Sequence, residues 1–313
     1  MRAVALAFAV VLALGPASTQ SPTPRRMAIT IDDLPGVPAD APVAALRSMT
    51  DAMVEALRAA QAPAFGFVNE GKLTIRGETH ERTALLETWL DAGVPLGNHT
   101  YSHPDLNTMP LAEYQRDVIR GEPVTFRLMI ARDRTERFFR HPFTHTGPSA
   151  PIKTAFERFL RARGYTIAPF TVENADYLFS SAIRAARRQS DADLIEKIEQ
   201  EYIAHTMSML DFYEPLAREI AGREFTQILL IHVNELNAAT LPQLLTRVAQ
   251  RGYRFVTLAS AMEDSVYRQR DGYIGRSGPS WIHRWRATRG LPSMMREEPE
   301  PPAWILRLVS GER

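Results

Sequence analysis

The segment Met27-Ala28-Ile29-Thr30-Ile31-Asp32-Asp33-Leu34-Pro35-Gly36 decides the fold prediction. Its first five residues are mostly apolar, which predicts a buried strand, and Pro35 with Gly36 ends it. Neighbouring side chains on a strand point to opposite faces, so Asp32 and Asp33 can serve one site only where the pleat breaks at the strand end. One carboxylate could then bind a metal while the other acts as a base. An ordinary solvated turn is the alternative interpretation.

Short apolar runs and amphipathic stretches alternate along the rest of the chain. Further strands are expected at residues 64–68, 94–97, 137–140, 165–170, 227–231 and 254–257. Helices are expected at residues 43–60, 78–92, 111–129, 152–163 and 241–250, and residues 178–220 predict one or two helices interrupted only by Pro215. About seven strand–helix units indicate an α/β protein, and their number favours a (β/α) barrel over an open doubly wound sheet.

Composition narrows the classes of function. The chain has 313 residues, of which 45% are hydrophobic and 23% charged, as in an ordinary globular protein. Its formal net charge of +1 gives no indication of nucleic acid or an anionic membrane as a partner. The absence of cysteine excludes disulfides and thiolate chemistry, so any metal ligands must be His, Asp or Glu.

The N-terminus has the pattern of a signal peptide. Arg2 precedes an apolar run at residues 3–14, and small residues follow at 15–19. The run is shorter than the ~20 residues that span a membrane. We therefore expect residues 1–19 to be removed, no stable membrane insertion afterwards, and a periplasmic or secreted protein; an uncleaved anchor or a buried N-terminal helix is the alternative.

The final fifty residues differ in composition from the barrel region. Gly, Pro, Trp and Arg are frequent there. We expect residues 20–262 to form the catalytic domain and residues 263–313 to form an extended tail that packs on the barrel.

The segment His99-Thr100-Tyr101-Ser102-His103 follows the strand predicted at 94–97. Histidines at i and i+4 lie on one face of a helical turn, close enough to bind one divalent ion. With Asp33 as the third ligand, the set leaves coordination positions open for water and substrate, which is typical of catalytic sites. Chance or surface placement of the two histidines remains the alternative.

Arg140 ends another predicted strand, in Phe138-Phe139-Arg140-His141-Pro142-Phe143. A buried guanidinium needs an anionic partner, and Asp32 is the obvious candidate. A purely stabilising ion pair with another acid is the alternative. His141 and His145 fit ordinary loop positions and are not assigned as ligands.

His232 ends the apolar run Ile228-Leu229-Leu230-Ile231. A histidine at the end of a buried strand is often a hydrogen-bonded core residue. At the mouth of a barrel that offers an acid pair and a metal, a general acid is the better interpretation.

These segments together resemble the polysaccharide deacetylases (carbohydrate esterase family 4, the NodB-homology domain). That family has the motifs Thr-Phe-Asp-Asp, His-x-x-x-His, Arg-x-Pro, Asp-Trp and Leu-x-His in this order. The matching segments are Thr30-Ile31-Asp32-Asp33, His99…His103, Arg140-His141-Pro142, Asp176-Tyr177 and Leu230-Ile231-His232. The resemblance covers about residues 27–260 and implies a distorted (β/α)7 barrel that holds a divalent metal, usually zinc.

The resemblance also implies a role for each matching residue. The metal ligands would be Asp33, His99 and His103. Asp32 would be the general base, Arg140 would orient it, the backbone amide of Phe143 would hold the oxyanion, and His232 would protonate the leaving amine with Asp176 as its orienting acid. The family's usual residues differ at Ile31, Phe143 and Tyr177, and Glu173 competes with Asp176 for the fourth motif.

The implied activity is hydrolysis of N-acetyl groups on an amino-sugar polymer or oligomer, with an acetylated glycan or oligosaccharide as substrate. Two other functions are kept open: a carbohydrate-binding barrel with impaired catalysis, and an amidohydrolase of a non-carbohydrate amide.

Overall fold

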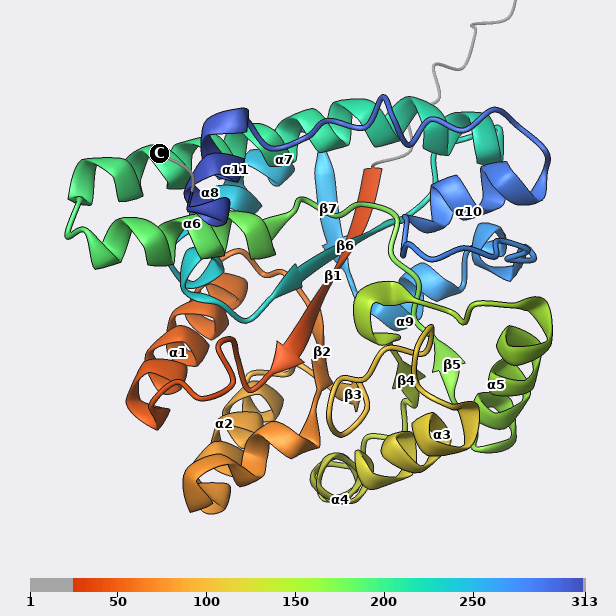
Figure 1. Ribbon diagram of the computed structural model, residues 1–313, viewed down its shortest axis with the longest axis horizontal. Coiled ribbons are helices and arrows are strands. Elements are labelled where there is room, and N and C mark those ends of the chain that lie inside the picture. The colour runs from red at the N-terminus through yellow and green to blue at the C-terminus, as the bar shows by residue number, and fades with distance from the viewer. Residues whose placement is uncertain (1–24, 312–313) are drawn as a thin grey trace, which may run out of the picture.

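The computed structural model describes residues 25–311, with a parallel sheet at the centre and helices around it (Figure 1). All strand pairs in this part of the chain are parallel. The strands are β1 (Arg25–Leu34), β2 (Ala64–Val68), β3 (Leu96–Asn98), β4 (Phe138–Phe139), β5 (Thr166–Ile167), β6 (Gln227–His232) and β7 (Tyr253–Val256).

The order of the strands closes the sheet into a barrel. The hydrogen-bonded order is β5-β4-β3-β2-β1-β6, and β7 pairs with the first residues of β1. A single parallel bridge between Val172 and Leu229 joins the segment after β5 to β6, so the two ends of the sheet meet. The prediction of a distorted (β/α)7 barrel is confirmed, and the distortion lies at this one-bridge closure.

Helices surround the sheet (Figure 1). The α-helices are α1 (Val43–Ala59), α2 (Thr79–Asp91), α3 (Leu111–Arg120), α4 (Pro123–Ile130), α5 (Ala150–Ala162), α6 (Asp176–Arg188), α7 (Ala192–Ala221), α8 (Glu235–Gln250), α9 (Leu258–Met262), α10 (Trp281–Thr288) and α11 (Ala303–Ser310). Shorter 3-10 helices are η1 (Glu70–Gly77), η2 (Pro142–Thr144) and η3 (Ser265–Arg268).

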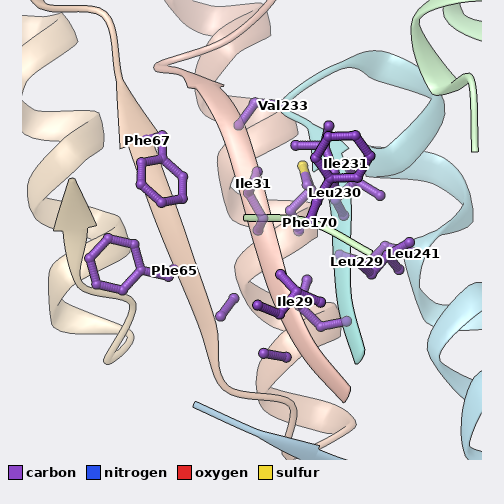
Figure 2. Close-up of a cluster of buried hydrophobic side chains, with 14 of the residues drawn as sticks. Ile29, Ile31, Phe65, Phe67, Phe170, Leu229, Leu230, Ile231, Val233 and Leu241 are labelled. Atoms are coloured by element: carbon purple, nitrogen blue, oxygen red, sulfur yellow. The ribbon is translucent and has the colours of Figure 1, made fainter. Parts of the chain in front are cut away.

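The core joins the apolar side chains of β1, β2 and β6 with those of the surrounding elements (Figure 2). Ile29 and Ile31 of β1 are fully buried in it. The residue between them, Thr30, is also buried, but its hydroxyl donates to the carbonyl of Leu229 at 2.8 Å and accepts a hydrogen bond from Arg140. Strand alternation thus separates an apolar side of β1 from a polar side that leads towards Asp32.

Two of the predicted helices are divided differently in the structure. The helix expected at residues 111–129 is broken between α3 and α4, where Gly121 follows the end of α3 and Pro123 begins α4. The expected interruption at Pro215 was wrong. Pro215 lies inside α7, and the break falls before it, where Asp191 caps α7 by accepting a hydrogen bond from the amide of Leu194 at 2.9 Å.

The last helices also depart from the prediction. α8 begins at Glu235 and not at Leu241, because the side chain of Asn234 caps it by accepting from the amide of Asn237 at 2.8 Å. The tail is not simply extended, since it contains α10 and α11. These helices contact α7 and α6, respectively, on the outside of the barrel (Figure 1).

The predicted signal peptide, residues 1–19, lies outside the residues that the structure describes. Within residues 25–311, no helix has the length and apolar character that crossing a membrane requires.

Candidate active site

The predicted site residues meet at the carboxyl ends of the barrel strands, which is the edge where barrels of this kind place their active sites. Most of them line one cavity of about 480 Å³, and the other two, Arg140 and Asp176, contact the lining residues Asp32 and His232. The residues around this cavity are Asp32, Asp33, His99, His103, His141, Phe143, Thr144, His145, Phe170, Glu173, Tyr177, Leu230, His232 and Gly278. The structure thus brings together residues that lie far apart in the sequence, such as Asp32 and His232.

Asp32 and Asp33 both reach the cavity because the pleat of β1 breaks between them. Asp33 has a left-handed φ of 72°, and the pairing of β1 with β2 shifts register between Ile31 and Leu34. This backbone turn brings two adjacent side chains to the same side. The predicted break is therefore present, but at Asp33 itself and not at the Pro35-Gly36 turn.

The two histidines come together by a different geometry from the one expected. Residues 99–103 form an irregular loop and not a helical turn, since Thr100 and His103 have φ values of 70° and 57°. Asp117 fixes this loop by accepting hydrogen bonds from the amides of Tyr101 and Ser102, both at 2.9 Å. The rings of His99 and His103 nevertheless lie edge to face, with centroids 4.9 Å apart.

Asp33, His99 and His103 form a group that could hold a metal ion. Their ligand atoms all lie within 4.8 Å of one another. Asp33 Oδ1 is 3.7 Å from Nε2 of His103 and 4.0 Å from Nε2 of His99. Two bonds of about 2.1 Å from a zinc ion can bridge atoms up to ~4.2 Å apart, so the two distances from Asp33 Oδ1 to the histidines suit one ion. The other ring nitrogen of His99 contacts the carbonyl oxygen of Arg140 at 2.8 Å, which fixes the ring so that Nε2 faces the group.

Lys72, on η1, also reaches this group. Its Nζ donates to Oδ1 of Asp33 at 2.8 Å and to the carbonyl oxygen of Asp33 at 3.1 Å. Burial by itself raises the pKa of Asp33, but the Lys72 ammonium and the nearby histidines outweigh burial and lower it. Asp33 is therefore ionised, as a metal ligand must be.

Asp32 lies deeper, opposite the guanidinium of Arg140. Its Oδ2 is 3.8 Å from Nη1 of Arg140, and both side chains are buried. Burial raises the pKa of Asp32 to about 6, against the lowering effect of Arg140. Its Oδ1 is buried without a hydrogen-bond partner among the described residues. A carboxylate oxygen that is buried and unpaired can accept a proton from a bound molecule.

His232 and Asp176 form a second, tightly bonded pair. Nδ1 of His232 contacts Oδ1 of Asp176 at 2.7 Å, and the backbone amide of His232 donates to Oδ2 at 2.8 Å. Asn234 and Asn237 also donate to Oδ2 of Asp176, at 3.0 and 2.5 Å. Burial by itself lowers the pKa of His232, but the Asp176 carboxylate outweighs burial and raises it to about 10. His232 is therefore protonated at neutral pH, with Nε2 left for a ligand.

Glu173, the competing acid of the fourth motif, takes a different place. Its carboxylate accepts a hydrogen bond from the amide of Ala175 at 3.1 Å, and burial raises its pKa to about 7. It lines the cavity, whereas Asp176 makes the contact with His232. His141 and His145 also line the cavity, and neither belongs to the group around Asp33.

Phe143 stands at the mouth of the cavity. Its side chain is 54% exposed, and its ring packs edge to face on His103 with centroids 4.6 Å apart. Its backbone has a left-handed φ of 53°. Phe143 therefore lies beside His103.

Four contributors to the site were missed from the sequence. Lys72 sits in a segment with no motif around it, so only the fold could bring it to Asp33. Asn237 follows Asn234 by three residues at the start of a helix, and this pair after His232 was a usable sign of a polar network. Gly278 belongs to the tail, which was expected to pack on the barrel but was assigned no site residue.

With this geometry in place, comparison with known proteins adds the family. Residues 19–150 match the model of the polysaccharide deacetylase family. The resemblance that the motifs predicted is therefore confirmed over these residues. The protein is a polysaccharide deacetylase-like hydrolase, of the class that acts on carbon–nitrogen bonds other than peptide bonds. No curated protein matches the chain.

Solved structures share the fold. The peptidoglycan deacetylase PdaC from Bacillus subtilis is similar at 18% identity and a TM-score of 0.50, over 80% of this chain and 95% of that one. A carbohydrate esterase family 4 pseudoenzyme from Bacillus anthracis is similar at 16% identity and a TM-score of 0.50, over 78% of this chain and 70% of that one. Since one of these is a deacetylase and the other a pseudoenzyme, the fold alone does not decide activity and the site residues must.

Proposed function

We propose that this protein is a metal-dependent deacetylase that removes N-acetyl groups from an amino-sugar polymer or oligomer. The observation that carries the proposal is that the Asp33–His99–His103 group, Asp32 and His232 line one cavity. Arg140 and Asp176 pair with Asp32 and His232, respectively. Metal ligands, a base and an acid in one cavity are what hydrolysis of an unactivated amide requires.

The residues present fit a zinc ion. Two histidine nitrogens and one carboxylate oxygen are a usual protein ligand set for zinc, and such a three-residue set leaves room for water and substrate. When bound there, a divalent ion would polarise the acetyl carbonyl and lower the pKa of a water molecule. Ionised Asp33 and largely neutral histidines are the protonation states that binding needs, because burial lowers the pKa of His99 and His103.

Asp32 is proposed as the general base. Its unpaired Oδ1 would take the proton from the attacking water, and its raised pKa of about 6 is suited to proton transfer near neutral pH. Arg140 would hold the carboxylate in place, because its own Nη2 is fixed by a 2.9 Å hydrogen bond to Thr30. The backbone N–H of Phe143 would donate to the oxygen that gains negative charge in the transition state.

His232 is proposed as the general acid. Asp176 fixes its Nδ1, so the proton that the leaving amine needs would come from Nε2. The pKa near 10 keeps that proton present at neutral pH. An amine is a poor leaving group unless it is protonated as the C–N bond breaks, so this proton is most important for amide substrates.

The proposed substrate is an acetylated glycan or oligosaccharide. Phe143 and Tyr177 are 54% and 55% exposed and both line the cavity, so their ring faces are available to pack on sugar rings. PdaC, which shares the fold, is a peptidoglycan deacetylase. The signal-like residues 1–19 support a proposed location in the periplasm or outside the cell.

Acetate release by the purified, zinc-loaded protein from a panel of acetylated glycans tests the proposal. We expect release from at least one amino-sugar polymer or oligomer, lost on chelation and restored by zinc. Release from small non-sugar amides alone would indicate an amidohydrolase of another class. Glycan binding without acetate release would indicate a catalytically impaired barrel. Either result would contradict the proposal.

A further inference from the structure

The C-terminal segment, residues 263–311, reaches the proposed active site from outside the part of the chain that carries the family motifs. α10 packs against α7 (Figure 1). The turn before α10 brings Gly278 to the wall of the cavity. The side chain of Ser280 donates to the carbonyl of Thr171 at 2.7 Å, and the amide of Trp281 donates to that of Phe170 at 3.0 Å. The segment is therefore bonded directly to the barrel edge where the site lies.

The loop that it meets, residues 142–146, has an unusual backbone. Phe143 and Thr144 are consecutive non-glycine residues, and both have a left-handed φ of 53°. Side-chain-bearing residues rarely adopt this conformation, and two in a row persist only when surrounding contacts fix them. The direction of the Phe143 amide depends on this conformation, since φ sets the orientation of the peptide plane.

Gly278 makes the closest of these fixing contacts. The hydroxyl of Thr144 donates to the carbonyl of Gly278 at 2.5 Å. A Cβ at position 278 would overlap with Oγ1 of Thr144 and with the carbonyl oxygen of Phe143. Only glycine permits this approach of two backbones, so the tail and the loop are fitted to each other at the atoms next to the Phe143 amide.

Arg284, on α10, also bonds to the 142–146 loop. Its side chain is fully buried. Nη2 donates to the carbonyl of Thr144 at 2.6 Å, Nη1 donates to Oγ1 of Thr146 at 3.0 Å, and Nε donates to the carbonyl of Pro279 at 2.9 Å. Three different nitrogens are used, and they join the loop to the turn that carries Gly278.

The charge of Arg284 is balanced by Asp271, whose Oδ2 is 3.4 Å from Nη1. The same Asp271 oxygen lies 2.6 Å from Nζ of Lys153 on α5. This network ties the C-terminal segment to the helix that follows the loop. A buried guanidinium with this many fixed partners acts as a rigid support and not as a surface ion pair.

We propose that Arg284 is a positioning residue for the reaction: with Gly278, it holds the 142–146 loop so that the N–H of Phe143 faces the reacting acetyl group. The C-terminal segment is then part of the catalytic unit and not an appendage. The role of the Phe143 amide rests on the proposed function, whereas the support of the loop by Arg284 rests on the contacts alone.

The test compares Arg284→Ala with Arg286→Ala, two substitutions on the same helix. Arg286 is also buried, but it pairs with Glu219 of α7 and donates to the carbonyl of Pro292, away from the loop. For Arg284→Ala we expect kcat for acetate release to fall roughly 10- to 100-fold with KM little changed, because losing one oxyanion donor typically costs 10²–10³. Guanidinium in the buffer should restore part of kcat. For Arg286→Ala we expect a lower melting temperature and a kcat close to that of the wild type.

Amide hydrogen exchange measures the order of the 142–146 loop without depending on enzyme activity. Arg284→Ala should speed exchange of the amides in residues 142–146, including that of Thr144, which is bonded to the carbonyl of His141. Arg286→Ala should not. If Arg284→Ala does not fold, Gly278→Ala tests the same contact with one added methyl group and no change of charge, and it should lower kcat in the same way.

The outcomes distinguish a failure of the positioning role of Arg284 from a failure of the proposed deacetylase function. A wild-type kcat with unchanged exchange in Arg284→Ala or Gly278→Ala would overturn the inference. So would an equal loss of kcat in Arg284→Ala and Arg286→Ala without guanidinium rescue, because Arg284 would then only stabilise the fold. An inactive wild-type protein would contradict the proposed function, and the exchange data would still decide whether Arg284 supports the loop.

Discussion

The pKa values of histidine and aspartate side chains are shifted in opposite directions on the two sides of the cavity. On one side, burial lowers the pKa of His99 and His103, while the ammonium of Lys72 helps to lower that of Asp33. On the other side, the pKa of His232 is raised to about 10, and burial raises that of Asp32 to about 6. The first side is in the protonation state of a metal site and the second in that of an acid–base pair.

The partner of the second ring nitrogen explains the contrast between the histidines. Nδ1 of His99 faces an uncharged carbonyl oxygen, that of Arg140, whereas Nδ1 of His232 faces the carboxylate of Asp176. A carboxylate partner stabilises the imidazolium far more than a carbonyl does. Histidine can therefore serve as a ligand or as an acid in one cavity, and the neighbouring residue decides which.

Asp32→Asn is expected to have the largest effect. It removes the proposed general base while keeping the size and shape of the side chain. We expect turnover to fall roughly 10²–10⁴-fold while bound metal is unchanged, because general-base catalysis contributes that much. Acetate release and metal analysis on the same samples measure this, with the exposed Asp40→Asn as control. Retention of more than about half of the wild-type activity would mean that Asp32 is not the base.

His232→Ala tests the proposed general acid by comparing an amide substrate with an ester substrate. We expect normal metal content, a large loss of amide hydrolysis and a much smaller loss on an aryl acetate, whose leaving group needs no proton. The ratio of the two rates is the measurement, and His80→Ala, at an exposed position, is the control. Equal losses on both substrates would assign His232 another role, and a lowered melting temperature with near-normal activity would make it a purely structural residue.

Asp176→Asn should shift the pH profile. The acid must be protonated, so activity falls as pH rises through the pKa of His232. Replacing the carboxylate that raises this pKa to about 10 should lower it, and the alkaline limb of kcat should move to lower pH. A shift of one unit or more is expected, since each unit corresponds to about 1.4 kcal/mol of lost interaction. An unchanged limb would contradict the assignment of that limb to His232.

Lys72→Met is expected to give the smallest effect and concerns the metal side. Lys72 places a positive charge 2.8 Å from Oδ1 of Asp33, where it opposes a cation at the same oxygen. Removing it should tighten zinc binding by about tenfold or more, because like charges a few ångströms apart repel strongly in a partly buried site. Competition with a fluorescent chelator measures this, with Lys197→Met as the matched lysine control. Weaker binding would show that Lys72 instead holds Asp33 in its ligand geometry.

Much of this site could be predicted because its residues sit at strand ends in recognisable motifs. Asp32, Asp33, His99, Arg140 and His232 were placed at one edge from the strand pattern alone. In the structure Arg140 pairs with Asp32, and the other four line one cavity. The local geometry at the histidines was not predictable in this way. Their loop conformation depends on Asp117, 14 residues beyond His103, and no periodicity in the sequence encodes that contact.

The parts that were missed depend on contacts between distant segments. Lys72 reaches Asp33 from η1, and Gly278 reaches Thr144 across 134 residues. The break before α7 and the early start of α8 had local signals, the caps Asp191 and Asn234, which the apolar pattern concealed. Sequence reasoning thus found the residues of the family motifs and missed those that support them.

Metal content of the histidine variants tests the central claim most directly. Zinc per chain, measured by plasma mass spectrometry after equal zinc loading and desalting, is compared in the wild type, His99→Ala, His103→Ala and His232→Ala. The division of the cavity predicts one zinc per chain in the wild type and in His232→Ala, and far less in the other two variants, with all four proteins folded. Full occupancy in both His99→Ala and His103→Ala, or loss of zinc in His232→Ala, would contradict it.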